Sequence, residues 1–291
     1  MGRESCAEKF MEGLWGMKRL NKTDIEQPFM IETRTLNDAH THIGTDKEWK
    51  ERKEAGILSL LCASTPEEAE KLFAIKGDYL IPTCGVHPWY ADIYPLEDML
   101  KYIRQCPVLG EIGMDNVWCN VPLNVQEDVF RQQLTLACQW KKPVILHTKG
   151  QEKEIADIIR NYPNRYLVHW YSSEYDLEEY LAIDCYFSIG PDVSWNPAVR
   201  QVAEKVPFNK LLIETDGLLA VRWAQEERFK LDTDKKISEQ SRKKYQNSDN
   251  TVVSALEEIL ENLALIRGIS PEEVGKICKH NLTAGFLDDI V

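Results

Sequence analysis

Short apolar runs alternate along the chain with longer stretches in which apolar residues recur every three or four positions. The runs are rich in Ile, Leu and Val and lack strict alternation, which predicts strands that are buried on both faces. The stretches between them predict amphipathic helices. The eight runs are Thr35–Ala39, Ile57–Cys62, Tyr79–Val86, Val108–Ile112, Pro143–His147, Tyr166–His169, Cys185–Ile189 and Leu211–Glu214.

Capping signals mark the starts of some of the predicted helices. Thr65–Glu68 combines an N-cap threonine, a proline in the first turn and a glutamate at the capping-box position, and Ser270–Glu273 repeats that arrangement. Apolar stripes at helical spacing predict two longer helices, over Asn124–Trp140 and Thr251–Arg267. Strands and helices are therefore expected to alternate along most of the chain.

This alternation predicts an α/β fold, namely a single (β/α)8 TIM barrel. The alternative is an open doubly wound sheet, but no Gly-x-Gly-x-x-Gly motif follows the first predicted strand. No linker rich in Pro, Gly or Ser divides the chain, so we interpret residues 34–291 as one domain and residues 1–33 as an N-terminal extension. A polar insertion at about residues 220–250 lacks regular apolar periodicity and predicts a mobile loop or a poorly packed helix.

Composition and charge narrow the function classes. The 291 residues are 43% hydrophobic and 28% charged, as in a globular protein, and the longest apolar run is too short to span a membrane. A net charge of −12 argues against coating nucleic acid through bulk charge, but not against touching phosphates through a few cations or metals. The eight cysteines form no Cys-x-x-Cys, and we find no secretory signal, so we expect a cytoplasmic protein with reduced cysteines.

The histidines are placed at one kind of position. Because the carboxyl ends of barrel strands converge on the active face, residues at those ends meet although they lie far apart in sequence. Histidines scattered through a core or over a surface would rarely show this placement. Five of the six lie at predicted strand ends, namely His40, His42, His87, His147 and His169, whereas His280 does not.

Two of these strand ends carry residues suited to binding metal ions. His40 and His42 are two positions apart, so both imidazoles can share one face of a strand and reach one ion, which suits zinc, manganese, iron or nickel. Glu111 lies between the glycines of Gly110–Asp115, where a carboxylate facing the barrel mouth can bridge two cations. A helix-capping or salt-bridging role is the alternative for Glu111.

The candidate ligands are numerous enough for two ions that share Glu111. Two metals a few ångströms apart can orient a water, lower its pKa and stabilise both the attacking and the leaving oxygen, and this chemistry favours phosphoester hydrolysis. The full set is His40, His42, Glu111, His147, His169 and Asp216.

Together, these motifs resemble those of the TatD family of metal-dependent deoxyribonucleases, among the hydrolase barrels related to amidohydrolases. The resemblance covers roughly residues 35–288. It is carried, in the order of the family, by Asp38–His42, Gly85–Pro88, Gly110–Asp115, His147, His169 and Glu214–Asp216. Further similar positions are Gln126, Phe130, Gln133, Leu134, Ala137, Pro143, Val144, Asn281 and Phe286.

The resemblance implies two divalent ions, Mg²⁺, Mn²⁺ or Zn²⁺, bridged by Glu111. It also implies that Asp216 accepts the proton of the attacking water and that His87 lies near the scissile phosphate. A bond from His87 to a backbone carbonyl is the alternative. The implied ligands are His40, His42 and Asp216 for one ion and His147 and His169 for the other.

Three departures from the family pattern concern substrate contacts. Lys149 stands where the family usually has arginine, and it can donate to phosphate without the two-pronged fork. Trp170 and Tyr171 follow His169 in place of the usual Cys-Phe, and they either stack on a base or pack against the rim. The stretch after Asp216 lacks the usual proline-containing loop and places Arg222 as a candidate substrate contact.

The resemblance implies a DNase of the 3′–5′ exonuclease type that acts on single strands or frayed ends. One alternative is an amidohydrolase acting on a small cyclic amide or ester, because a metal-activated hydroxide also attacks a carbonyl carbon. Against it, Glu111 stands where many such enzymes use a carboxylated lysine. The other alternative is a metal-binding partner module that has lost turnover, against which the complete ligand set argues.

The insertion at 220–250 is basic within an acidic chain, since its lysines and arginines outnumber its acids. It follows the last predicted strand and therefore begins on the active face. We expect it to contact the nucleic-acid backbone or, like the N-terminal extension, a protein partner. Its basic residues are Arg222, Arg228, Lys230, Lys235, Lys236, Arg242, Lys243 and Lys244.

Replacing Arg242, Lys243 and Lys244 with glutamine should weaken DNA binding and flatten its dependence on salt. The reason is that each lost phosphate contact removes about one counterion from the release that drives binding. Kd measured over a series of salt concentrations checks this expectation. An unchanged slope would show that these three side chains do not contact DNA.

Overall fold

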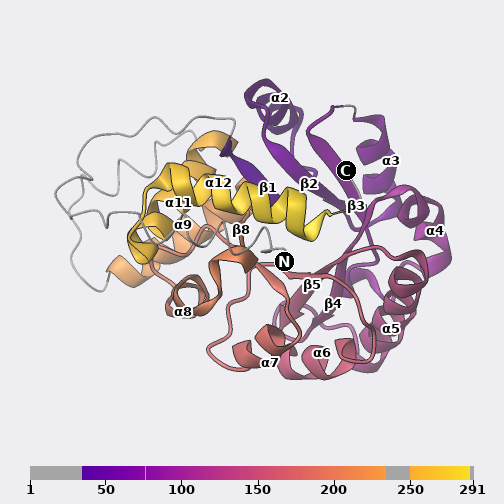
Figure 1. The fold of residues 1–291 in the computed structure, drawn as a ribbon. Helices are drawn as coiled ribbons and strands as arrows, with labels where there is room; N and C mark the ends of the chain where they lie inside the picture. The colour runs from indigo at the N-terminus through magenta and orange to yellow at the C-terminus, as the bar shows by residue number, and fades with distance from the viewer. Residues whose placement is uncertain (1–34, 76, 234–249, 289–291) are drawn as a thin grey trace, which may run out of the picture.

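The computed structural model describes residues 35–75, 77–233 and 250–288. Within them, eight parallel strands form one sheet in the order β1 to β8. The backbone amide of Asp216, just after β8, donates to the carbonyl of His40 in β1 (3.2 Å), so the sheet closes on itself. Figure 1 shows the strands at the centre with the helices around them, which confirms the predicted (β/α)8 TIM barrel.

Each predicted strand overlaps an observed one. The largest difference is in the first, which runs on through His40 and His42 because its polar end still pairs with the second strand. The strands are β1 Asn37–His42, β2 Leu58–Ala63, β3 Leu80–Cys84, β4 Val108–Asp115, β5 Val144–Lys149, β6 Tyr166–Val168, β7 Tyr186–Ile189 and β8 Leu211–Ile213.

The helices between the strands begin where the capping signals indicated. The side chains of Thr65 and Ser270 accept the amides of Glu68 and Glu273 at the starts of α3 and α12. The helices are α2 Asp46–Ala55, α3 Pro66–Ala74, α4 Leu96–Gln105, α5 Leu123–Trp140, α6 Glu152–Ile159, α7 Leu177–Ala182, α8 Pro197–Lys205, α9 Leu218–Thr233, α11 Val252–Arg267 and α12 Pro271–His280. Three short turns are η3 Pro88–Tyr90, η4 Phe208–Lys210 and η5 Asn281–Phe286, the last a π-helix.

A loop and a poorly packed helix were the two alternatives for the polar insertion. Residues 220–233 follow the second alternative, because they belong to α9. Val221 and Ala224, three positions apart, are buried, and this apolar strip is too narrow to stand out among charged neighbours. Residues 1–34 and 234–249 lie outside the described residues, and with them the N-terminal extension and the basic residues Lys235, Lys236, Arg242, Lys243 and Lys244.

The barrel interior is filled with apolar side chains below the carboxyl ends of the strands. The π-helix η5 packs against this cluster, and the side-chain amide of Asn281 donates to the carbonyls of Phe208 (2.6 Å) and Leu211 (2.8 Å). The cluster consists of Ala39, Leu58, Leu60, Ile81, Val108, Ile145, Leu167, Tyr186 and Leu212 from the strands, with Leu282, Phe286 and Leu287 from the C-terminal segment.

A buried ion pair lies at the seam where β1 meets β8. Arg52 of α2 donates to Asp38 (2.7 Å), Ser59 (3.0 Å), Thr41 (2.9 Å) and Thr215 (3.2 Å). The carboxylate of Asp38 also accepts both the amide (2.9 Å) and the hydroxyl (2.6 Å) of Thr215. The pair therefore ties α2 and β1 to the end of β8. Among the helices of the described residues, none combines the length and the apolar character that a membrane span needs.

Replacing Arg52 with methionine should lower the free energy of unfolding by about 3–5 kcal/mol, because it leaves the buried Asp38 carboxylate without its cation. Arg131→Met is the matched control, since the Arg131 side chain is 42% exposed and pairs with Glu127 on the surface of α5. The control should lose no more than about 1 kcal/mol. Urea denaturation measures both variants, and equal losses would contradict a structural role for the buried pair.

Candidate metal centre

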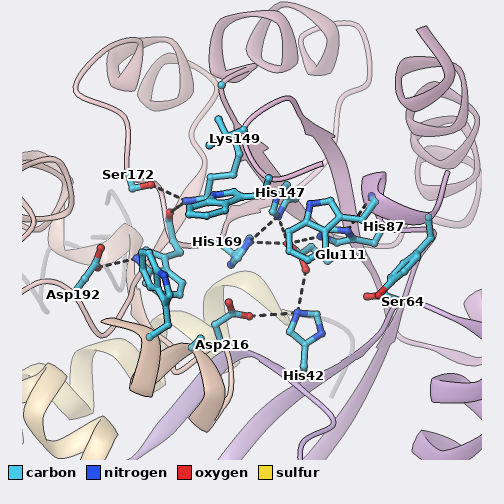
Figure 2. A pocket seen from close by; sticks show the side chains of 18 of the residues that line it. His42, Ser64, His87, Glu111, His147, Lys149, His169, Ser172, Asp192 and Asp216 are labelled. Atoms are coloured by element: carbon cyan, nitrogen blue, oxygen red, sulfur yellow. Dashed lines mark hydrogen bonds and ion pairs between the residues drawn. The ribbon is translucent and has the colours of Figure 1, made fainter. Parts of the chain in front are cut away.

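Histidine and carboxylate side chains from six strand ends point toward one another at the barrel mouth (Figure 2). His40, a residue of β1, and Glu111 are buried, whereas His42 is about 40% exposed. The structure thus brings together all six residues that were predicted as ligands. The side chains labelled there include His42, His87, Glu111, His147, His169 and Asp216.

Both strands that carry the innermost of these residues are irregular at that point. The pairing register shifts within residues 38–41 of β1 and within residues 109–112 of β4, which span His40 and Glu111. Such irregularities bend a strand and redirect its side chains. A Cβ atom at Gly113 would lie 1.9 Å from a backbone carbonyl of β5, so only glycine allows this approach of the two strands. The local backbone therefore turns Glu111 toward the mouth.

One oxygen of Glu111 faces the first group of candidate ligands. Its Oε2 atom lies 3.4 Å from Nε2 of His40 and 3.6 Å from Nε2 of His42. Oδ1 of Asp216 lies 3.3 Å and 3.4 Å from the same two nitrogens. Nε2 of His40, Oε2 of Glu111 and Oδ1 of Asp216 are buried and have no hydrogen-bond partner among the described residues. Converging, unpartnered nitrogen and oxygen atoms fit a divalent cation.

The electrostatics of this group favour a cation as well. Burial alone lowers the pKa of His40, but the carboxylates of Glu111 and Asp216 outweigh burial and raise this pKa well above its usual range. Burial likewise opposes ionisation of Glu111, yet His169, His87, His147 and His40 hold its pKa well below the usual range. The site therefore attracts positive charge, which either a proton on His40 or a bound metal supplies.

The other oxygen of Glu111 faces the second group. Its Oε1 atom lies 2.5 Å from Nδ1 of His147 and 2.7 Å from Nε2 of His169. Each ring presents its far nitrogen to a carboxylate, with Nε2 of His147 3.0 Å from Asp115 and Nδ1 of His169 3.3 Å from Glu214. A carboxylate on the far nitrogen holds the proton there and turns the lone pair of the near nitrogen toward the centre.

Asp115 is a positioning residue that the motif analysis did not assign. Its carboxylate accepts the indole N–H of Trp89 (2.6 Å) and the amides of Val117 (2.7 Å) and Trp118 (2.8 Å), in addition to facing His147. Burial opposes ionisation, but the hydrogen bonds with His147, Trp118 and Trp89 lower the pKa of Asp115 below its usual range. The only sequence signal for this role is its place at the strand end that carries Glu111.

His87 faces the centre as a donor. Its Nε2 atom lies 3.5 Å from Oε1 of Glu111, and its Nδ1 atom accepts the amide of Trp89 (3.2 Å). Burial lowers the pKa of His87 to about 4, so the ring is neutral at pH 7. A neutral imidazole that accepts at Nδ1 carries its proton on Nε2. His87 therefore directs an N–H toward the mouth, in place of the bond to a backbone carbonyl that was the alternative.

A cavity of about 650 Å³ opens beside the candidate ligands, within the usual size of a small-molecule site. Lys149 lines it, and its ammonium group donates to the carbonyl of Trp170 (3.2 Å) and the hydroxyl of Ser172 (2.7 Å). Trp170 also lines the cavity, so this predicted contact faces the substrate side.

Tyr171 needs correction as a predicted substrate contact, whereas Arg222 stays a prediction. Tyr171 is buried, packs against Tyr180 and Phe187, and donates its hydroxyl to the carbonyl of Tyr175, so it has no face toward the cavity. Arg222 is exposed on α9 and is absent from the described cavity lining. In both places the adjacent residue lines the cavity instead, Trp170 next to Tyr171 and Trp223 next to Arg222. Sequence reasoning also missed Trp89, Trp118 and Trp223 as lining residues.

A TIM barrel with histidines and carboxylates gathered at its mouth defines the class of metal-dependent hydrolases. The chain belongs to the family described as TatD related DNase, whose sequence model matches residues 37–286. This finding confirms the predicted family and a hydrolase that acts on phosphodiester bonds.

Relatives agree with this assignment. The chain is 27% identical over 208 residues to the uncharacterized metal-dependent hydrolase YabD of Bacillus subtilis. The matched region covers 62% of this chain and 79% of YabD. The chain is also 26% identical over 201 residues to the 3′–5′ ssDNA/RNA exonuclease TatD of Pantoea ananatis, covering 62% and 77%. The crystal structure of YjjV, a TatD homologue from Escherichia coli, shares the fold with a TM-score of 0.69 at 20% identity, covering 87% of this chain and 98% of YjjV.

Adding Mn²⁺ or Zn²⁺ to EDTA-treated protein should raise Tm, because an ion that binds only the folded state stabilises it. At a hundredfold excess over Kd the gain is about 2.7 kcal/mol, which corresponds to roughly 5–10 °C for a chain of this size. Glu111→Gln should lose most of the shift, since both groups share this charge. Glu154→Gln, on the exposed side of α6, is the control and should keep it. Differential scanning calorimetry that shows no shift for the unmodified chain would contradict a metal centre.

Proposed function

We propose that this hydrolase removes nucleotides from the 3′ end of single-stranded or frayed DNA, using water activated by two divalent ions, Mg²⁺, Mn²⁺ or Zn²⁺. The observation that carries the proposal is that the two carboxylate oxygens of Glu111 face different groups of candidate ligands. Its Oε2 atom faces His40 and His42, whereas its Oε1 atom faces His147 and His169. A carboxylate divided in this way suits a bridging ligand.

The ligand groups follow from the same contacts. His40, His42 and Asp216 would hold one ion, and His147 and His169 the other, with Glu111 shared. Two divalent ions so held would lower the pKa of the attacking water and offset the charge that develops on the phosphate.

The chain itself supplies a proton acceptor. Burial raises the pKa of Asp216, but its contacts with His40 and His42 outweigh burial and lower that pKa. Asp216 therefore stays ionised at neutral pH and is available to accept the proton of the attacking water.

Two donors are placed to hold the phosphate. His87 presents its Nε2–H beside Glu111, and a neutral imidazole can donate to a phosphate oxygen without repelling the metal ions. Lys149 uses two of its three N–H donors on Trp170 and Ser172, which leaves one for a phosphate oxygen. These roles orient the scissile bond toward the attacking water.

The choice of substrate rests on the relatives. The Pantoea ananatis protein is named a 3′–5′ ssDNA/RNA exonuclease, which supports both the polarity and the preference for single strands. Within the described chain, seven cysteines are free, and reduced thiols favour a cytoplasmic location.

The proposed DNA or protein contacts of residues 234–249 lie outside the described residues and stay predictions.

The purified protein should shorten 3′-end-labelled single-stranded DNA in the presence of Mg²⁺ or Mn²⁺ and fail to do so in EDTA. Glu111→Ala should lower the rate by at least about 10²-fold, because it removes the charge that both ligand groups share. Glu154→Ala is the control and should retain the full rate. Gel electrophoresis of the labelled products measures each rate.

Other outcomes would identify the alternatives. Metal binding without cleavage of DNA or RNA under any condition would favour a partner module without turnover. Metal-dependent hydrolysis of a cyclic amide or ester, with nucleic acids left intact, would favour an amidohydrolase. Either result would overturn the nuclease proposal.

A further inference from the structure

Three tryptophans from separate parts of the chain meet beside the candidate metal centre. Trp118 follows β4, Trp170 follows β6, and Trp223 belongs to α9. The ring of Trp223 lies 6.0 Å from that of Trp118 at an interplanar angle of 89°, and 5.8 Å from that of Trp170 at 72°. All three line the cavity that also holds the candidate ligands. We call these residues the tryptophan trio.

Trp170 is held as a fixed platform. Its φ of +38° lies in the left-handed region that a bulky residue rarely adopts. Its indole N–H donates to Asp192 (2.7 Å), which in turn accepts from Asn196 (2.7 Å), and Figure 2 shows Asp192 on the cavity wall. A Cβ atom at Gly190 would lie 2.7 Å from the ring, so glycine makes room for the indole. Backbone strain with such support is characteristic of functional sites.

The other two members of the tryptophan trio are solvent-exposed. Trp118 is 57% exposed and Trp223 is 37% exposed. Exposed aromatic surface that adjoins a polar site marks a place where a ligand binds. Because neighbouring rings stand nearly perpendicular to one another, a planar ligand can lie flat on one ring while its edge meets the next.

The charge of the cavity indicates which planar ligand fits. Lys149 is the single lysine or arginine in the described lining, against five carboxylates. Its ammonium group lies 5.8 Å from the centroid of the Trp170 ring. A group that can donate a hydrogen bond to a phosphate therefore adjoins the aromatic surface. A lining with one cation cannot follow a long polyanion, and it suits a ligand with one phosphodiester and one aromatic ring. The carboxylates are Glu68, Glu111, Glu152, Asp192 and Asp216.

We propose that the tryptophan trio binds the base of the terminal nucleotide by stacking, while the adjoining phosphodiester lies at the metal centre. This inference rests on the proposed nuclease function and assigns the part of the substrate that the enzyme recognises. Every base has a π-face, so stacking accepts all four bases. Within the described lining, the end of a strand is thus recognised through one base, with little help from the phosphates farther along.

The test compares two single-stranded oligonucleotides that differ only at the 3′ end, which carries either adenosine or an abasic tetrahydrofuran unit. For the unmodified enzyme, KM should be about 5- to 150-fold lower with the terminal base, the range that one base–aromatic stack gives. Trp223→Leu and Trp118→Leu should each bring the ratio of the two KM values toward one, and Trp223→Phe should retain part of it. Leu219→Ala, which removes an exposed apolar side chain from the same helix, should keep the full ratio.

A binding measurement separates this inference from the nuclease proposal. In EDTA, quenching of tryptophan fluorescence by the adenosine-ended strand should exceed quenching by the abasic strand, and the difference should shrink in Trp223→Leu. Base-dependent quenching in EDTA, together with no cleavage when Mg²⁺ or Mn²⁺ is added, would overturn the nuclease proposal and leave the stacking site standing. Equal quenching by both strands, or equal KM values in a cleaving enzyme, would overturn the stacking site.

Discussion

The buried pair of Arg52 and Asp38 governs how the barrel closes, and the candidate site depends on that closure. Asp38 binds both polar groups of Thr215, and so it fixes the end of β8 against β1. His40 and Asp216 extend from these two segments and face each other at 3.3 Å. Without Arg52, the Asp38 carboxylate would be buried without a cation and three neighbouring hydroxyl groups would lose their donor, which is unfavourable in a dry interior. The same interaction therefore holds the fold together and brings candidate ligands from the first and last strands of the barrel into one group.

Glu111, unlike Asp38, is a buried carboxylate without an arginine or lysine beside it in the described part of the chain. A carboxylate that is 1% exposed must be compensated by positive charge, and its neighbours are imidazoles instead of permanent cations. The rings near Oε1 are oriented from behind by Asp115 and Glu214. The centre thus carries more carboxylates than fixed cations, and the imbalance is itself the physical basis for binding metal ions.

Much of the fold and of the ligand set could be predicted from the sequence, because both depend on local patterns. Buried strands read as apolar runs, and strand ends converge in any barrel, so His40 and His147 could be placed together without a structure. The details that failed depend on backbone geometry. The left-handed φ of Trp170 turns its indole to the cavity and sends Tyr171 into the core, and no apolar pattern reveals that turn. Trp223 depends on the phase of α9, whose apolar strip is short.

The C-terminal π-helix has a consequence for turnover. Because η5 and the apolar cluster fill the barrel below the site, the described interior offers no passage through to the opposite end. Under the proposed exonuclease function, a released nucleotide would leave through the same mouth by which the strand entered. The shortened strand would then have to withdraw or tilt before the product departs, because entry and exit use one opening. This shared opening favours an enzyme that releases its strand between cuts over one that moves along it.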